Sequence, residues 1–111
     1  MQKEFRRKAP RRTYDSPVGI LYRGKMSFTP CLQIGEGGAL IAQLPGPNPI
    51  QEGESIVITI FFPVIGGVVS TAECVYFSED NTVGLSFVDL GMDFKKKIRE
   101  FVSRRKTIEA A

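Results

Sequence analysis

Six short runs of β-branched and aromatic residues fill most of this 111-residue chain, and turn-forming residues separate each run from the next. The run at residues 55–62 is the most hydrophobic; it is too short to cross a membrane and suits a central strand. Runs of this length with turns between them predict antiparallel strands. Six such strands can close on themselves, so we expect an all-β fold, a six-stranded antiparallel barrel.

The other expected strands show the same pattern, and they lie at residues 17–23, 26–34, 39–44, 68–77 and 82–88. In the first of them, period two puts Val18, Ile20 and Tyr22 on one face. The second begins with period two but is disturbed near Pro30, which predicts an edge position or a bulge.

The segment after the last strand changes from period two to a helical period. Its apolar residues fall near one face of a helix expected from about Asp93 to Arg105, and they are Leu90, Phe94, Ile98, Phe101 and Val102. A helix with one apolar stripe needs a surface to cover. We expect it to cover one open end of the barrel.

Charge is distributed unevenly along the chain. Residues 1–12 carry six basic residues and one acid. Residues 13–94 carry two basic residues and nine acids, and residues 95–106 carry seven basic residues and one acid. The length fits a single core. We therefore expect a flexible basic arm at 1–12, the barrel with its helix at 13–105, and a tail at 106–111, with an anionic partner approaching the basic ends.

Several classes of function have no support in the composition. Histidine is absent, which excludes Ser-His, Cys-His and His-metal chemistry, and the acids of the body show no spacing that suggests a catalytic pair, so no enzyme is expected. Cys31 and Cys74 lie in apolar stretches and are expected to be buried thiols of a reducing compartment. No apolar run reaches the length of a membrane span, so we expect a cytoplasmic protein.

The basic arm contains Arg6, Arg7, Arg11 and Arg12 around Pro10. It lacks the apolar surface that would offset its ordering entropy, so by itself it is expected to be mobile. Arginine presents a rigid fork of donors that fits phosphate and the guanine edge, and its flat cation stacks on bases. An anionic ligand could order the arm. The alternative is a solubilising tail or a loose contact with nucleic acid.

The order of these features resembles a PilZ domain over about residues 5–104. The resemblance is carried by an Arg-x-x-x-Arg arm at Arg7 and Arg11, a Gly-Gly turn ending at Gly38, a long apolar strand, the Val-Gly-Leu-x-Phe run at residues 83–87 and a closing helix. It implies a six-stranded barrel that binds the bacterial second messenger cyclic di-GMP, with no further cofactor. Arg6, directly before the motif, is expected to engage a second stacked nucleotide.

The second part of the family's site is Asp/Asn-x-Ser-x-x-Gly, which falls here on residues 33–38. Gln33 and Gly35 replace the acid and the hydroxyl, and Gly38 matches. An aspartate would accept two hydrogen bonds from guanine, whereas Gln33 offers one neutral oxygen on a longer side chain. Each lost charge-assisted bond is worth roughly 1.5 to 3 kcal/mol, so the affinity is expected to fall by about 10² or more without compensation. Glu36 adds a negative charge near a dianionic ligand.

The leading hypothesis is a bacterial, cytoplasmic receptor for cyclic di-GMP, whose ligand residues are Arg6, Arg7, Arg11, Gln33, Gly35 and Gly38. Nucleotide binding would order the arm and signal to an unidentified effector protein. The alternative is a degenerate PilZ domain that binds no nucleotide, or binds it weakly, and acts as an adaptor between proteins. Direct binding of DNA or RNA through the basic ends is less favoured and predicts a steep dependence on salt.

Overall fold

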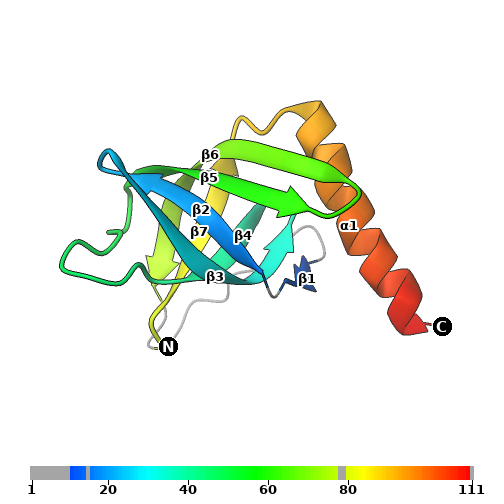
Figure 1. Ribbon diagram of the computed structural model, residues 1–111, viewed down its shortest axis with the longest axis horizontal. Coiled ribbons are helices and arrows are strands. Elements are labelled where there is room, and N and C mark those ends of the chain that lie inside the picture. The colour runs from blue at the N-terminus through cyan, green and yellow to red at the C-terminus, as the bar shows by residue number, and fades with distance from the viewer. Residues whose placement is uncertain (1–10, 15, 78–79, 111) are drawn as a thin grey trace.

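The computed structural model describes residues 11–14, 16–77 and 80–110, without the side chains of residues 11 and 105–110. Figure 1 shows strands wound into a barrel, with one helix crossing its end. The elements are β1 (Arg11–Thr13), β2 (Pro17–Tyr22), β3 (Lys25–Gly35), β4 (Gly38–Ala42), β5 (Ser55–Phe62), β6 (Gly66–Phe77), β7 (Thr82–Val88) and α1 (Met92–Ala110).

The barrel closes through the long strand β3. Neighbouring strands follow the order β3-β2-β5-β6-β7-β4, every pair is antiparallel, and β4 pairs back with β3 to complete the ring. The expected six-stranded antiparallel barrel is therefore confirmed. The sequence pattern did not predict the seventh strand, β1, which pairs with the end of β3.

Alternating side chains build the core. In β5 and β6, every second residue is buried, and the same alternation buries Val18, Ile20 and Tyr22 in β2 as expected. Both cysteines are buried and carry free thiols, which confirms the prediction of burial for Cys31 and Cys74. The barrel interior is thus a continuous apolar core that positions its surface residues rigidly.

The apolar residues of β3 behave differently from those of its neighbours. Met26, Phe28 and Leu32 point outward and are exposed, whereas Thr29 and Cys31 are buried. Near Pro30 the strand changes partners: it pairs with β2 up to the position where Pro17 faces Pro30, and beyond it with β1. Proline has no N–H to donate to a ladder, so pairing is expected to change there. The register against β4 also shifts between Cys31 and Gln33, close to the predicted irregularity.

Helix α1 covers one end of the barrel, as expected, and contacts β1, β3 and β6. Ile98, Phe101 and Val102 join the core, and Leu90 and Phe94 pack against it. The helix is longer than the range predicted from the apolar stripe, since it continues to Ala110. The extra residues contain no glycine or proline that would end it.

The opposite end of the barrel is closed by the loop between β4 and β5 (Figure 1). Gln43 shapes this loop: its amide oxygen accepts hydrogen bonds from the N–H groups of Leu44 (3.0 Å) and Ile50 (2.9 Å), and its amide nitrogen donates to the Ile50 carbonyl (3.1 Å). These bonds hold Ile50 in the core, where its side chain is fully buried.

Glu54 holds the same loop against the β2–β3 hairpin. Its carboxylate accepts hydrogen bonds from the Tyr22 hydroxyl, from the Gln51 N–H at 2.8 Å and from Arg23 at 3.1 Å. The hydrogen bond from Tyr22, followed by those from Gln51 and Arg23, lowers the pKa of Glu54 below its ordinary value. This end of the barrel is therefore closed by contacts within one loop and one hairpin.

Candidate functional site

Strand β1 brings the end of the basic arm next to the altered motif. In the β1–β3 ladder, Arg11 lies opposite Gly35 and Thr13 lies opposite Gln33. Just beyond the ladder, the Tyr14 N–H donates to the Leu32 carbonyl at 3.0 Å, which fixes the same register. Two segments that are well separated in the sequence are therefore adjacent at one edge of the barrel.

Gln33 lies between two neighbouring strands, since it pairs with Thr13 on one side and with Leu40 of β4 on the other. Its side chain is half-buried, and the following residues Ile34 and Gly35 are buried. The backbone of the candidate motif is thus held rigidly by the sheet.

The last glycine of the motif has a structural role of its own. Gly38 begins β4 opposite Ser86, and a Cβ atom added there would lie 1.9 Å from the carbonyl oxygen of Leu85. No side chain fits at that distance from a backbone atom. At Gly37, by contrast, nothing lies within 4 Å of such an atom. The match of Gly38 to the family motif therefore follows from strand packing, whether or not a ligand binds.

Glu36 occupies the tight turn between β3 and β4 and forms an ion pair with Arg99 of α1. The guanidinium donates two hydrogen bonds to the carboxylate, from Nε at 2.9 Å and from Nη2 at 3.0 Å. This bond, with a further contribution from Lys95, holds the pKa of Glu36 below its ordinary value. The negative charge noted in the sequence is therefore balanced by the helix.

Arg12 connects β1 to the same helix. Its guanidinium lies 3.7 Å from the centre of the Phe101 ring and donates a hydrogen bond to the Phe101 carbonyl at 2.8 Å. Phe101 also packs against Tyr14 and Phe62, with ring centres 5.5 Å and 4.6 Å away. The strand that carries the end of the arm is thus anchored on α1 by cation–π and aromatic contacts.

Some of the predicted ligand residues lie in the part of the chain that the structure describes, and others lie outside it. Gln33, Gly35 and Gly38 lie together at the β3–β4 junction, and the backbone of Arg11 pairs with that junction. Arg6 and Arg7 lie outside the described residues.

Sequence reasoning missed two arginines near this junction, Arg12 and Arg99. Arg12 was grouped with the arm, although it follows Arg11 directly and belongs to a paired strand. Arg99 lies outside the apolar stripe of the helix, and no local pattern in the sequence indicates that it would meet Glu36.

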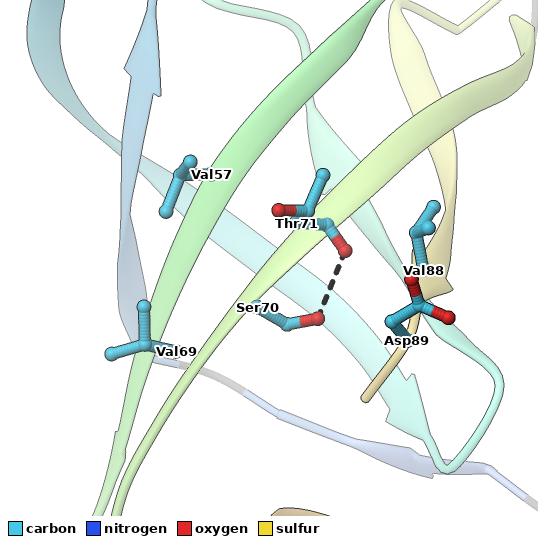
Figure 2. Close-up of a pocket in the computed structure, with 6 residues that line it drawn as sticks. All are labelled: Val57, Val69, Ser70, Thr71, Val88 and Asp89. Atoms are coloured by element: carbon cyan, nitrogen blue, oxygen red, sulfur yellow. Dashed lines mark hydrogen bonds between the residues drawn. The ribbon is translucent and has the colours of Figure 1, made fainter. Parts of the chain in front are cut away.

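A surface depression of about 450 Å³ lies away from these residues, on the outside of β5, β6 and β7. Figure 2 shows Val57, Val69, Thr71 and Val88 around it, with Ser70 donating a hydrogen bond to the Thr71 carbonyl. Gln33, Gly35 and Gly38, the predicted ligand residues that the structure describes in full, do not line it. It forms part of an exposed face of the barrel and is a separate feature from the β3–β4 junction.

Comparison with known proteins agrees with this architecture. The sequence matches the model of the PilZ domain family over residues 5–104. The chain belongs to the PilZ domain family. No curated protein sequence matches it significantly. Domains of this family are receptor and adaptor domains rather than enzymes, in line with the expectation from composition.

Solved PilZ structures share the fold at low sequence identity. The Bacillus subtilis inhibitor of motility (MotI/DgrA) aligns with 100% of this chain at a TM-score of 0.81 and 18% identity, and the match spans 56% of that protein's chain. The PilZ domain of Escherichia coli YcgR with c-di-GMP has a TM-score of 0.69 and 15% identity, with 96% and 97% of the two chains covered.

The Borreliella burgdorferi PlzA protein in complex with c-di-GMP has a TM-score of 0.65 and 14% identity, over 87% of this chain and 41% of that one. At these identities the matches describe the fold. This chain thus spans about half the length of MotI and less than half of PlzA.

Proposed function

We propose that this PilZ domain is a receptor and adaptor module for cyclic di-GMP, in which nucleotide binding orders the N-terminal arginine arm and signals to a partner protein. The observation that carries the proposal is the β1–β3 ladder, which puts Arg11 opposite Gly35 and Thr13 opposite Gln33. Arg11 and Arg12, at the end of the basic arm, therefore lie beside the motif on which a ligand would rest.

The chemistry of the arm suits this ligand. Arg7 and Arg11 would hold guanine edges, stack on a base and contact the phosphodiesters, and Arg6 would engage a second stacked nucleotide. Gln33 would accept fewer hydrogen bonds from guanine than an aspartate, so we propose weaker binding than a complete motif would give. Because the charge of Glu36 is balanced by Arg99, the turn repels a dianion less than its sequence implies.

The cellular setting follows from the same ligand. Cyclic di-GMP is a bacterial second messenger, so we propose a bacterial cytoplasmic location and an unidentified effector protein as the recipient of the signal. Among the described residues, no helix is both long enough and apolar enough to span a membrane.

Calorimetric titration with cyclic di-GMP tests the proposal. Wild-type protein is expected to release or absorb heat at ligand concentrations up to about 100 μM, and Arg7→Ala or Arg11→Ala is expected to weaken binding by about tenfold or more. Lys25→Ala is the matched control, since it removes one positive charge from the β2–β3 hairpin at the far end of the barrel. The absence of any heat with wild-type protein and ~100 μM ligand would contradict the proposal.

A second candidate function, an adaptor that needs no nucleotide, is favoured by an exposed apolar face. Across β3, β2, β5 and β6, neighbouring rows of outward-facing residues carry no charge up to the row that contains Glu73 of β6. The large apolar residues of these rows are Leu21, Met26, Phe28, Phe61 and Val69. Phe28 and Phe61 are 71% and 64% exposed. Large exposed apolar patches on soluble proteins commonly mark contacts with other proteins.

The two functions are separated by restoring the family motif. If Gln33→Asp combined with Gly35→Ser creates cyclic di-GMP binding that the native chain lacks, the adaptor function is the correct one. If the native chain already binds, the double variant is expected only to tighten binding. The arm variants serve as a control, since Arg11→Ala should reduce binding in both backgrounds.

A further inference from the structure

The guanidinium of Arg99 holds the Glu36 carboxylate in the same geometry in which an arginine holds a phosphate group. Two parallel N–H donors of one guanidinium meet both oxygens of one carboxylate, at 2.9 Å and 3.0 Å. Phosphate oxygens fit the same fork of donors. The side chain of Arg99 is 56% exposed, so another anion can reach it from solvent.

The position of the pair relates it to the proposed nucleotide site. Glu36 directly follows Gly35, which lies opposite Arg11 in the β1–β3 ladder. A ligand held by the arm and by this turn would bring its phosphodiesters close to the Glu36 carboxylate. Like charges repel at that distance, while both anions are attracted to the same guanidinium.

Helix α1 can keep its place if Arg99 changes partners. Ile98, Phe101 and Val102 are buried in the core, and Arg12 holds the Phe101 carbonyl and ring independently of Glu36. The Arg99–Glu36 pair is by contrast a contact at the surface, and exposed pairs contribute little to stability. Breaking it therefore leaves the helix docked.

The helix also offers a second positive charge at this turn. Lys95 lies one helical turn before Arg99, and its charge helps to lower the pKa of Glu36. Two cations of α1 thus act on one carboxylate. An anion that displaced Glu36 would be attracted to both Lys95 and Arg99.

Resting on the proposed function, we propose that Arg99 is a further phosphate-binding residue of the nucleotide site, occupied by Glu36 until the ligand arrives. Binding transfers the guanidinium from the carboxylate to a phosphodiester. The β3–β4 turn and helix α1 would then share the ligand, which makes α1 part of the site.

Titration of four proteins with cyclic di-GMP tests this role: wild type, Glu36→Gln, Arg99→Gln and the double variant. Glu36→Gln removes the competing charge and should tighten binding by about tenfold, whereas Arg99→Gln should weaken it by a similar factor. The decisive comparison is Arg99→Gln in the Glu36→Gln background. A phosphate contact predicts that binding still weakens by about tenfold, whereas a residue that only neutralises Glu36 predicts no change.

The pair Glu100–Arg104 provides matched controls on the same helix. These residues form a 2.7 Å ion pair, and both side chains are about half exposed. Glu100→Gln changes the net charge as Glu36→Gln does, and Arg104→Gln as Arg99→Gln does. Both controls should leave the affinity within about twofold of wild type if the effects are local, since the two charges pair with each other and exposed pairs have small effects.

A second measurement needs no variant that could fold poorly. The Nε–H signal of Arg99 in an NMR spectrum of wild-type protein should shift during titration, while that of Arg104 stays in place. Thermal melting of each variant verifies that the barrel is intact.

The outcomes separate the two proposals. Wild-type binding that Glu36→Gln leaves unchanged or weakens overturns the role of Arg99 and leaves the receptor function standing. Binding by Glu36→Gln but not by wild type contradicts both proposals for the native chain, because the ligand then does not displace the Glu36 carboxylate from Arg99. If neither protein binds cyclic di-GMP, both proposals fail.

Discussion

The two ends of the barrel are closed in different ways. At one end, helix α1 is joined to β1 and to the β3–β4 turn by side chains that come from distant parts of the sequence. At the other, the β4–β5 loop is closed by Gln43 and Glu54, which mostly bond to nearby backbone and to the adjacent hairpin (Figure 1).

This difference indicates which end is suited to respond to a ligand. The bonds of Gln43 are partly buried and satisfy backbone groups, so no anion can replace them without leaving polar groups unsatisfied. The Glu36–Arg99 pair is exposed and both of its members are charged, so another anion can take its place. We therefore assign ligand response to the helix end and expect the loop end to take no part in ligand binding.

The largest expected effect concerns the turn at the helix end. Gly38→Ala would place a Cβ atom 1.9 Å from the Leu85 carbonyl oxygen, so β4 must move away from β7. We expect a loss of about 4 kcal/mol or more in the free energy of unfolding, measured by chemical denaturation. Gly37→Ala is the control: it has open space around it and should change stability by less than about 1 kcal/mol. Similar stabilities for the two variants would show that the strand contact is not rigid.

Phe101→Ala tests how α1 is attached. It removes a ring that is 9% exposed and packs on Tyr14, Phe62 and Arg12. The expected loss is about 3 kcal/mol in the free energy of unfolding, from denaturant titration. Met92→Ala on the same helix is the control and should have little effect, because Met92 is 62% exposed. Equal losses would mean that aromatic packing does not anchor the helix.

Gln43→Ala tests the loop end. It removes three hydrogen bonds to backbone groups and leaves the N–H of buried Ile50 without its acceptor. We expect a loss of about 2 kcal/mol in the free energy of unfolding, with no change in cyclic di-GMP affinity. Gln51→Ala, in the exposed part of the loop, should be nearly neutral. A large drop in nucleotide affinity for Gln43→Ala would contradict the separation of the two ends.

The smallest effect is expected in the pH dependence of stability. Glu36 and Glu54 both have a pKa below the ordinary value of 4.5, Glu36 mainly through Arg99 and Glu54 mainly through Tyr22. Their contribution is present above the ordinary value and is lost as the pH falls through the lowered folded value. Melting temperatures between pH 7 and about pH 3 should therefore fall less for Glu36→Gln and Glu54→Gln than for wild type.

Glu54→Gln is expected to show the larger change of the two, since Glu54 accepts bonds from three residues and Glu36 from one. A melting temperature that falls with acid as steeply in Glu54→Gln as in wild type would show that these bonds do not stabilise the loop end.

The pattern of residues was sufficient to predict the barrel. Strand β5 was expected at residues 55–62 and β7 at residues 82–88, and both were found there. Period two and turn residues act locally, so a single sequence reveals them. Strand β1 was missed because its three residues pair only with a β3 edge that the barrel itself creates.

For the candidate site too, the sequence predicted one part and the tertiary structure decided the rest. From the sequence alone, residue type predicted the basic arm, and the resemblance to the PilZ family predicted the motif at residues 33–38. Their adjacency was decided by the tertiary structure, through the register that puts Arg11 opposite Gly35. The partner of Glu36 was also decided there, because Arg99 lies 63 residues away and only the packing of α1 on the core brings the two charges together.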